Sequence, residues 1–267
     1  MRLGVFMSRS KVFRMISSGL VSITFRQLTP EAIIGLVREA GLRGIEWGGD
    51  VHVPHGDLKR AREVGEMTRE AGLEVAAYGS YFRVGHSEGD GLLFSHVVDS
   101  ALELGASVIR VWAGSEGSTT VSDEQRRRVV EDLRRITELA AKAGVRVATE
   151  FHGGTLTDTN ESTNQLLLEV DHANLYTYWQ PLMGMSDETC VEAIGQLSLR
   201  LSHLHVYHWD SVKERCVLAA GTERWQQFLQ AAHEVPGDRY AMLEFVKDDA
   251  PENFLRDAAT LREWLKI

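Results

Sequence analysis

The sequence predicts a single-domain (β/α)8 barrel, and three observations support this prediction. Helical stretches alternate with short apolar stretches along the 267 residues, which is typical of a parallel sheet covered by helices. Several helices end in a glycine that is followed, two or three residues later, by an apolar strand. Eight such units in about 250 residues match the size of a closed (β/α)8 barrel.

Four joints between a helix and the next strand share one pattern. A glycine stands just past each helix, where it accepts the left-handed backbone conformation that closes a helix. A short loop then leads into an apolar stretch. The four joints are Gly41 before 44–47, Gly72 before 73–78, Gly105 before 107–112 and Gly144 before 145–150. This repeated order predicts successive βα units.

Two helix starts can also be identified. Thr29 precedes Pro30, which places a capping side chain before a proline at the first helical position. Ser122 and Gln125 have the spacing of a capping box, and they precede a long amphipathic stretch over residues 123–143. Both signals place a helix where the alternation requires one.

Four further apolar stretches complete a set of eight predicted strands. They lie near residues 20–25, 174–179, 200–206 and 240–245, and a helical stretch follows each. The alternative arrangement, a doubly wound open sheet, usually carries a glycine-rich phosphate turn after its first strand. The residues after the first predicted strand, 26–28, are Arg-Gln-Leu and contain no glycine. We therefore predict one barrel domain over residues 1–267, with residues 1–17 as an extension before the first strand.

Composition argues against several classes of protein. The net charge of −9 repels phosphate backbones and counts against a nucleic-acid binder. No stretch approaches the roughly 18 consecutive apolar residues of a membrane helix. Residues 1–19 contain neither an unbroken apolar stretch nor a cleavage site of small residues, so we expect no secretory signal. Cys190 and Cys216 have no paired spacing, which favours free thiols in the cytoplasm.

Polar side chains stand at the ends of four successive predicted strands. In a barrel of this class the active site lies at the carboxyl ends of the strands. The four residues are Glu150, Gln180, His205 and Glu244. Side chains alternate across a strand, so His152 can share a face with Glu150, and His203 with His205. Each residue alone is often structural, but their joint placement favours one shared site.

This set of donors predicts a metal site. Two carboxylates that converge in a pocket repel each other, and their pKa values rise unless a cation neutralises them. Three oxygen donors and one imidazole suit Mn²⁺, Mg²⁺ or Co²⁺, with Zn²⁺ as a further option. Three tryptophans at strand ends, Trp47, Trp112 and Trp179, either pack the barrel or line a sugar site.

At this point the chain resembles a known family over essentially its whole length. The segments that carry the resemblance are 44–54 (GIEWGGDVHVP), 149–154 (TEFHGG), 202–206 (SHLHV) and 243–246 (LEFV). They resemble the xylose isomerase-like superfamily of TIM barrels, which includes sugar phosphate isomerases and epimerases. The resemblance implies a sugar or sugar phosphate as substrate, and it implies that the chain forms homo-oligomers, as family members often do.

The resemblance also implies a ligand set for one divalent metal ion. Members of the family typically use a glutamate, an aspartate, a histidine and a glutamate on strands five to eight. These roles fall on Glu150, Gln180, His205 and Glu244, and His205 fits the family segment better than His203. Gln180 departs from the pattern, because the amide removes one negative charge from the site. We expect weaker metal binding, a changed metal preference or a changed reaction.

The mechanism implied by the resemblance is proton transfer next to a carbonyl, through a metal-stabilised enediolate. Glu150 and Glu244 would serve as ligands and as the catalytic acid and base. Arg215, in the loop after the seventh predicted strand, is a candidate for holding a substrate hydroxyl or phosphate. Three histidines are further candidates for contact with the substrate, namely His52, His86 and His152.

Three other functions are compatible with the same sequence. A lyase similar to inosose dehydratase would abstract a proton in the same way and then expel a hydroxyl group. A hydrolase similar to family 2 apurinic endonucleases would need more histidine and aspartate ligands and a basic face. A sugar-binding barrel without catalytic activity is the third alternative, and Gln180 is the residue that favours it.

Overall fold

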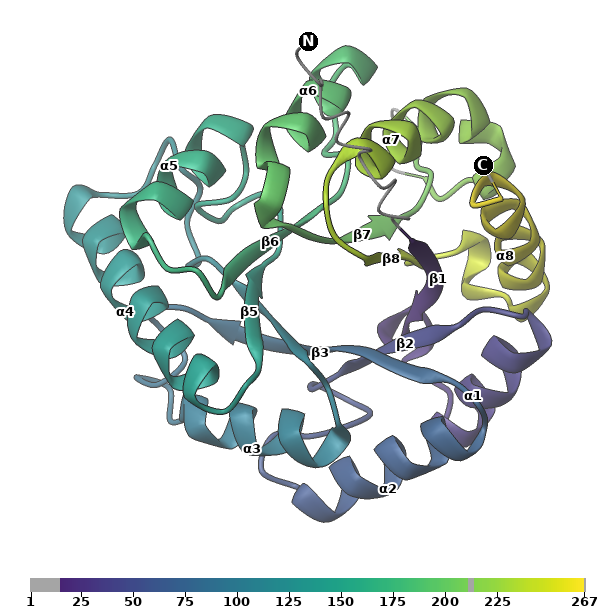
Figure 1. Ribbon diagram of the computed structural model, residues 1–267, viewed down its shortest axis with the longest axis horizontal. Coiled ribbons are helices and arrows are strands. Elements are labelled where there is room, and N and C mark those ends of the chain that lie inside the picture. The colour runs from purple at the N-terminus through teal and green to yellow at the C-terminus, as the bar shows by residue number, and fades with distance from the viewer. Residues whose placement is uncertain (1–14, 211–213, 267) are drawn as a thin grey trace, which may run out of the picture.

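The predicted barrel is present in the computed structural model, which describes residues 15–210 and 214–266. Eight parallel strands follow one another around a closed barrel, and the first strand pairs with the eighth. Helices form a ring outside the strands (Figure 1). The single-domain (β/α)8 architecture is therefore confirmed.

The strands and helices alternate without exception in the described residues. The strands are β1 (Ile16–Val21), β2 (Gly44–Gly48), β3 (Glu74–Arg83), β4 (Val108–Trp112), β5 (Arg146–Thr149), β6 (Leu175–Trp179), β7 (Leu201–Val206) and β8 (Arg239–Leu243). The helices are α1 (Pro30–Glu39), α2 (Leu58–Glu70), α3 (Phe94–Leu104), α4 (Asp123–Lys142), α5 (Asn160–Val170), α6 (Asp187–Leu197), α7 (Thr222–Glu234) and α8 (Pro251–Trp264). Each strand is thus followed by its own loop, and all of these loops lie at the same end of the barrel.

The first strand lies earlier than the sequence predicts. Residues 20–25 were the predicted strand, but β1 spans Ile16–Val21 and Ser22–Phe25 form a 3-10 turn. Both segments are buried, so their hydrophobicity does not distinguish a strand from the turn that follows it. β1 therefore begins two residues inside the segment assigned to the amino-terminal extension.

The helix signals in the sequence are confirmed. The Thr29 hydroxyl accepts from the Ala32 amide ahead of Pro30, and Ser122 with Gln125 forms a full capping box on α4. The four glycines at the helix-to-strand joints all have positive φ, from 65° at Gly41 to 84° at Gly105. Glycine is favoured there because a side chain strains this conformation.

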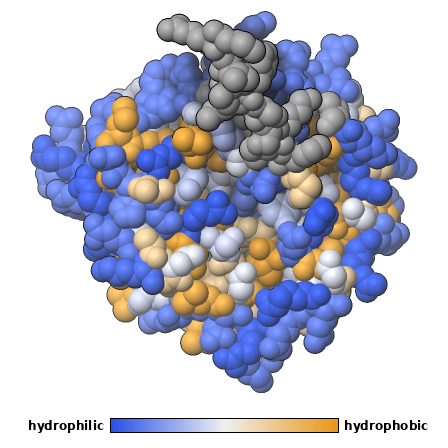
Figure 2. Space-filling model, viewed as in Figure 1, coloured by the Kyte–Doolittle hydropathy of each residue, from blue (hydrophilic) through white to orange (hydrophobic). Residues whose placement is uncertain are grey.

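Two buried clusters hold the barrel together. The larger joins the outer sides of the strands to the helices, and it includes Trp47, Trp179 and Phe254. The smaller lies among the strands and consists of Val21, Ile23, Ala76, Ala77, Val108, Ala148, Tyr178 and Met242. Figure 2 shows mainly hydrophilic side chains over the outer helices. Besides these apolar residues, the strands bury Glu46, Arg110 and His205 almost completely.

A buried aspartate on α8 supports the chain after β7. Asp257 is 3% exposed, and its carboxylate accepts a hydrogen bond of 2.8 Å from the Leu218 amide. Burial raises the pKa of Asp257 from 3.8 to about 6. The stability contributed by this group is therefore fully present below its ordinary pKa and is lost as the pH rises through about 6.

Asp257→Asn is expected to stabilise the protein at pH 8 by about 2 kcal/mol, because the amide keeps the acceptor for Leu218 without a buried charge. The gain should shrink as the pH falls from 6 to 4, where the native carboxyl is protonated. Urea unfolding of both proteins across this range measures the difference. A variant that is less stable than the native protein at pH 8 contradicts this account.

Candidate active site

A cavity of about 570 Å³ lies beyond the carboxyl ends of the strands. Its polar lining consists of Arg26, Arg110, Glu150, His152, Gln180 and Glu244. Its aromatic and apolar lining includes Ile23, Tyr81, Trp112, Pro181, Leu182, Met183, Tyr207, Trp209 and Phe245. The cavity therefore combines Arg110 of β4 and polar side chains that follow β1, β5, β6 and β8 with largely aromatic walls, as small-molecule sites commonly do.

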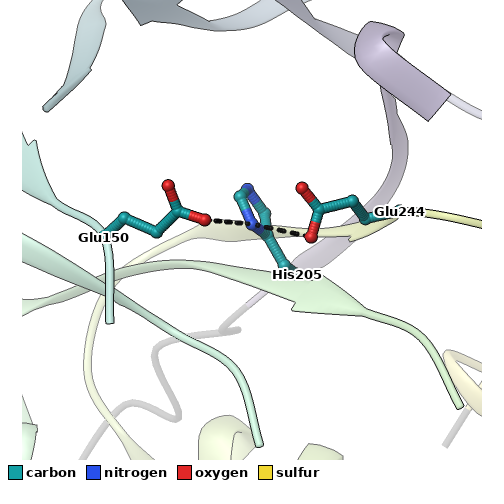
Figure 3. A group of neighbouring side chains, drawn as sticks. All are labelled: Glu150, His205 and Glu244. Carbon is teal, nitrogen blue, oxygen red and sulfur yellow. Dashed lines mark ion pairs between the residues drawn. The ribbon is translucent and has the colours of Figure 1, made fainter. Parts of the chain in front are cut away.

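Three of the predicted ligands meet at the base of this cavity. Glu150, His205 and Glu244 each offer a donor atom, and these atoms lie within 4.8 Å of one another. Figure 3 shows the two carboxylates on either side of the imidazole. His205 Nδ1 is 3.6 Å from a Glu150 oxygen and 3.4 Å from a Glu244 oxygen. Among residues 15–210 and 214–266, this is the one such group of histidine, cysteine and carboxylate donors found.

Gln180 lies directly beside these three residues. Its side-chain oxygen accepts from His205 Nδ1 at 3.1 Å, and its Nε2 group donates to Glu150 at 3.4 Å. The amide thus contacts the imidazole and one carboxylate at the same time. An aspartate here would place a negative charge against Glu150, whereas the amide can donate to it.

Two charged residues beside the cluster, Arg110 and Glu46, extend it across the barrel strands. Arg110 on β4 donates to Glu46 on β2 through Nε at 2.7 Å and to Glu150 through Nη1. Trp112 Nε1 also donates to Glu150. Arg110 and Glu46 are at most 2% exposed as side chains. One guanidinium therefore joins a predicted ligand to a carboxylate that the sequence analysis did not select.

The carboxylates of this network are held in their charged form. Burial alone would raise the pKa of Glu46, but Arg110 and His205 lower it to about 2. Burial opposes ionisation of Glu150 as well, and Arg110 and His205 again hold its pKa well below the usual range. At neutral pH both side chains are therefore acceptors without a proton.

His205 has the opposite shift. Burial would lower the pKa of this imidazole, but Glu244, Glu150 and Glu46 raise it well above the usual value. Without a metal ion the imidazole is therefore protonated and faces the carboxylates as a cation. The same carboxylates would attract a metal ion, which would replace the proton on the imidazole.

The charges around the cluster suit a divalent cation. Glu46, Glu150 and Glu244 supply three negative charges, and the Arg110 guanidinium balances one of them. Two negative charges remain when His205 is neutral, as a ligating imidazole must be. Carboxylate oxygens and an imidazole are also suitable ligands for the divalent ions predicted from the sequence.

Gln180→Asp is expected to tighten binding of Mn²⁺ by about tenfold, because a third carboxylate would face the ion. In the metal-free protein the new charge would face the protonated His205 as well as Glu150. Calorimetric titration measures the Mn²⁺ affinity, and metal-free thermal unfolding checks that the variant is folded. Unchanged Mn²⁺ affinity would remove position 180 from the predicted ligand set.

His152 lies in the cavity wall, as expected for a residue that contacts substrate. Its ring stacks on Trp112 with centroids 5.1 Å apart. Its Nδ1 group is 2.6 Å from the Gly153 carbonyl oxygen, which requires a proton on Nδ1. In the neutral imidazole, Nε2 then carries the lone pair and can accept a proton.

The other three predicted substrate contacts lie outside the cavity lining. His52 is 3% exposed, and its Nδ1 bonds to the Ser22 hydroxyl at 2.9 Å. His86 bonds to Ser115 and lines a separate depression. Arg215 pairs with Asp249, and it contacts two residues of the cavity wall, Phe245 through its guanidinium and Trp209 through a β-bridge. The structure therefore does not bring His52, His86 or Arg215 into the lining of this cavity.

Two of the three tryptophans at the strand ends pack the barrel, and the third lines the cavity. Trp47 and Trp179 belong to the buried core, and Trp47 donates to the Thr68 hydroxyl. Trp112 lines the cavity and contacts both Glu150 and His152.

Tyr81 and Phe245, which also line the cavity, adopt a φ of 54° each, a strained conformation for aromatic residues.

Comparisons with known proteins agree with this fold. The family model described as xylose isomerase-like TIM barrel matches residues 34–266. The chain belongs to this family.

None of the described helices is both long enough and apolar enough to cross a membrane.

Individual relatives carry more particular activities. A 3-dehydroshikimate dehydratase of Bacillus anthracis is 31% identical over 203 residues, which span 70% of this chain and 69% of the relative. The crystal structure of the probable 3-DHS dehydratase AsbF from the same organism has a TM-score of 0.80 at 24% identity, covering 92% of this chain and 99% of AsbF. A D-psicose 3-epimerase from Clostridium cellulolyticum has a TM-score of 0.70 at 14% identity, covering 94% and 98%.

Proposed function

We propose that this protein is a metal-dependent dehydratase that removes water from a small cyclic hydroxy ketone, with 3-dehydroshikimate as the first candidate substrate. This reading replaces sugar isomerisation as the first choice and keeps the lyase chemistry that the sequence left open. The 31% identical dehydratase relative supports it. The aromatic walls of the cavity also offer faces against which a six-membered ring can pack.

The observation that carries the proposal is the state of Glu150. An epimerase of the two-glutamate type needs both glutamates to exchange protons with the substrate. Here Arg110 Nη1 and Trp112 Nε1 both donate to the same oxygen of Glu150, and such hydrogen bonds stabilise the unprotonated carboxylate. A carboxylate in that state is a weak base. Glu150 therefore suits ligation better than proton transfer.

Glu150, His205 and Glu244 would hold the divalent ion, with Gln180 beside them. When bound, such an ion stabilises the negative charge that develops on a substrate oxygen next to the reacting carbon. The role of these side chains is to present charged and neutral donors at the base of the cavity. All four are buried.

His152 is our candidate for the general base. Its neutral Nε2 would accept the proton from the carbon beside the ketone, which also carries a hydroxyl in 3-dehydroshikimate. The electron pair of that bond then expels the hydroxyl from the next carbon, and a proton joins it to form water. A shift of one further ring proton gives the aromatic product, so that one molecule of water is lost overall.

The direct test is incubation of the purified protein with Mn²⁺ and 3-dehydroshikimate. We expect 3,4-dihydroxybenzoate to form, and its aromatic absorbance gives the rate. Activity should disappear after chelation and return with added Mn²⁺. Absence of product with the metal-loaded, folded protein would reject the dehydratase proposal.

Epimerisation of a ketose is the second candidate. Glu150 and Glu244 lie on either side of His205, and both line the cavity, so two carboxylates are available for proton exchange. Interconversion of D-fructose and D-psicose in the same preparation, without dehydration of 3-dehydroshikimate, would favour this alternative. The two assays therefore separate the candidates.

A further inference from the structure

We propose that Glu46 is a positioning residue that orients His205 for metal binding, and that Arg110 connects it to Glu150. The inference rests on the proposed metal site but not on the identity of the substrate. Neither Glu46 nor Arg110 belongs to the predicted ligand set. Glu46 lies beside His205, and Arg110 contacts Glu150, so the pair reaches two of the predicted ligands.

The two ring nitrogens of His205 face different groups. Nδ1 is directed at Gln180, Glu150 and Glu244. Nε2 lies 3.6 Å from Oε2 of Glu46, which is longer than a hydrogen bond. Both of these atoms are buried without a hydrogen-bond partner among the described residues. If Nδ1 binds the ion, Nε2 carries the proton, and Glu46 is the carboxylate positioned to accept it.

The other oxygen of Glu46 is held in place. Oε1 accepts from Arg110 Nε at 2.7 Å, and the same guanidinium donates to Glu150. Arg110 thus fixes one ligand directly and the other through Glu46. Carboxylates that accept from the free ring nitrogen of a ligating histidine commonly set the ring orientation and the affinity for the metal.

Gly79 on β3 leaves space for this ion pair. β3 lies between β2 and β4, so the Glu46–Arg110 contact crosses in front of it. A Cβ atom on Gly79 would lie 2.7 Å from Glu46 Oε1 and 2.8 Å from Arg110 Nη2. Both distances are too short for a carbon atom. The contact therefore depends on glycine at this position.

The test is calorimetric titration of Co²⁺ into the metal-free protein, together with the visible absorption spectrum of the Co²⁺ form. Glu46→Gln is expected to weaken Co²⁺ binding by about 10-fold to 100-fold, which is the range for loss of such a supporting carboxylate. It should also change the visible spectrum of the bound Co²⁺. Asp257→Asn is the matched control, because it converts a buried carboxylate to an amide away from the cluster. It should leave the affinity and the spectrum unchanged.

A second comparison tests whether Glu46 acts through His205. In a His205→Ala background, Glu46→Gln should weaken Co²⁺ binding by a smaller factor than it does with His205 present, because only the path through Arg110 to Glu150 remains. If E46Q does not fold, Gly79→Ala tests the same contact without removing a charge, and it should also weaken Co²⁺ binding.

Two results would overturn the inference. One is unchanged Co²⁺ affinity and spectrum in folded E46Q, or in folded G79A if E46Q does not fold. The other is an equal effect of E46Q with and without His205. If the native protein binds no Co²⁺, the metal site and this inference fall together. Lack of dehydratase activity in a protein that binds Co²⁺ rejects the proposed reaction alone.

Discussion

Glu150→Gln is expected to weaken divalent-metal binding by more than about 100-fold, because loss of a ligand should exceed the effect of losing a supporting residue. Turnover of the metal-dependent reaction should fall with it. The substitution also leaves Arg110 without one of its two carboxylate partners. Elemental analysis of the dialysed protein and steady-state kinetics measure the two losses.

Far-ultraviolet circular dichroism must first show that the Glu150→Gln protein is folded. Asp257→Asn serves again as a control, because it alters a buried carboxylate outside the cavity. Metal content equal to that of the native protein would remove Glu150 from the ligand set. Recovery of turnover at high Mn²⁺ concentration would instead support its role as a ligand.

His152→Gln is expected to lower kcat by about 10²-fold to 10⁴-fold, which is the range for removal of a general base. Metal content should remain unchanged, since His152 lies in the cavity wall and not in the three-residue donor group. Steady-state kinetics and elemental analysis of the same sample test both statements. This combination differs from the result expected for Glu150→Gln, where metal and turnover are lost together.

The matching substitution, Glu244→Gln, tests whether Glu244 is the base in the case that His152 is not the base. Full activity of His152→Gln would contradict our assignment. Loss of proton exchange in Glu244→Gln, with metal still bound, would then point to a carboxylate base. Exchange of the substrate proton with deuterated solvent is the measurement that separates these two residues.

The sequence predicts this fold well because its signals are local. Glycines such as Gly41 and Gly144 close helices through their own backbone conformation, and Ser122 caps its helix through residues three positions away. The first strand was misplaced because Ser22–Phe25 is as buried as the strand before it. Whether such a segment is extended or turned depends on its neighbours in space.

The site was predictable in part for a similar reason. Glu150 and Glu244 stand directly after apolar strands, where a polar residue is noticeable in the sequence. Arg110 and Glu46 gave an equally clear signal, since each is a charged residue inside an apolar strand. That pattern indicates a buried ion pair. The partners come from β2 and β4, and the pairing of both strands with β3 brings them together.

The loop residues were the least predictable. His52 and His86 follow strands that end at the cavity, yet their loops direct them to Ser22 and Ser115. Arg215 is held by Asp249, which lies in a different loop. Position after a strand shows which end of the barrel a residue occupies. It does not show which way the side chain points.

The central claim is that one divalent ion binds between Glu150, His205 and Glu244. Its most direct test is a crystal of the protein grown with Mn²⁺ and measured for anomalous scattering. We predict one strong peak within bonding distance of both carboxylates and of His205 Nδ1. A crystal without a peak at this position, in protein that is folded and exposed to excess Mn²⁺, would contradict the claim.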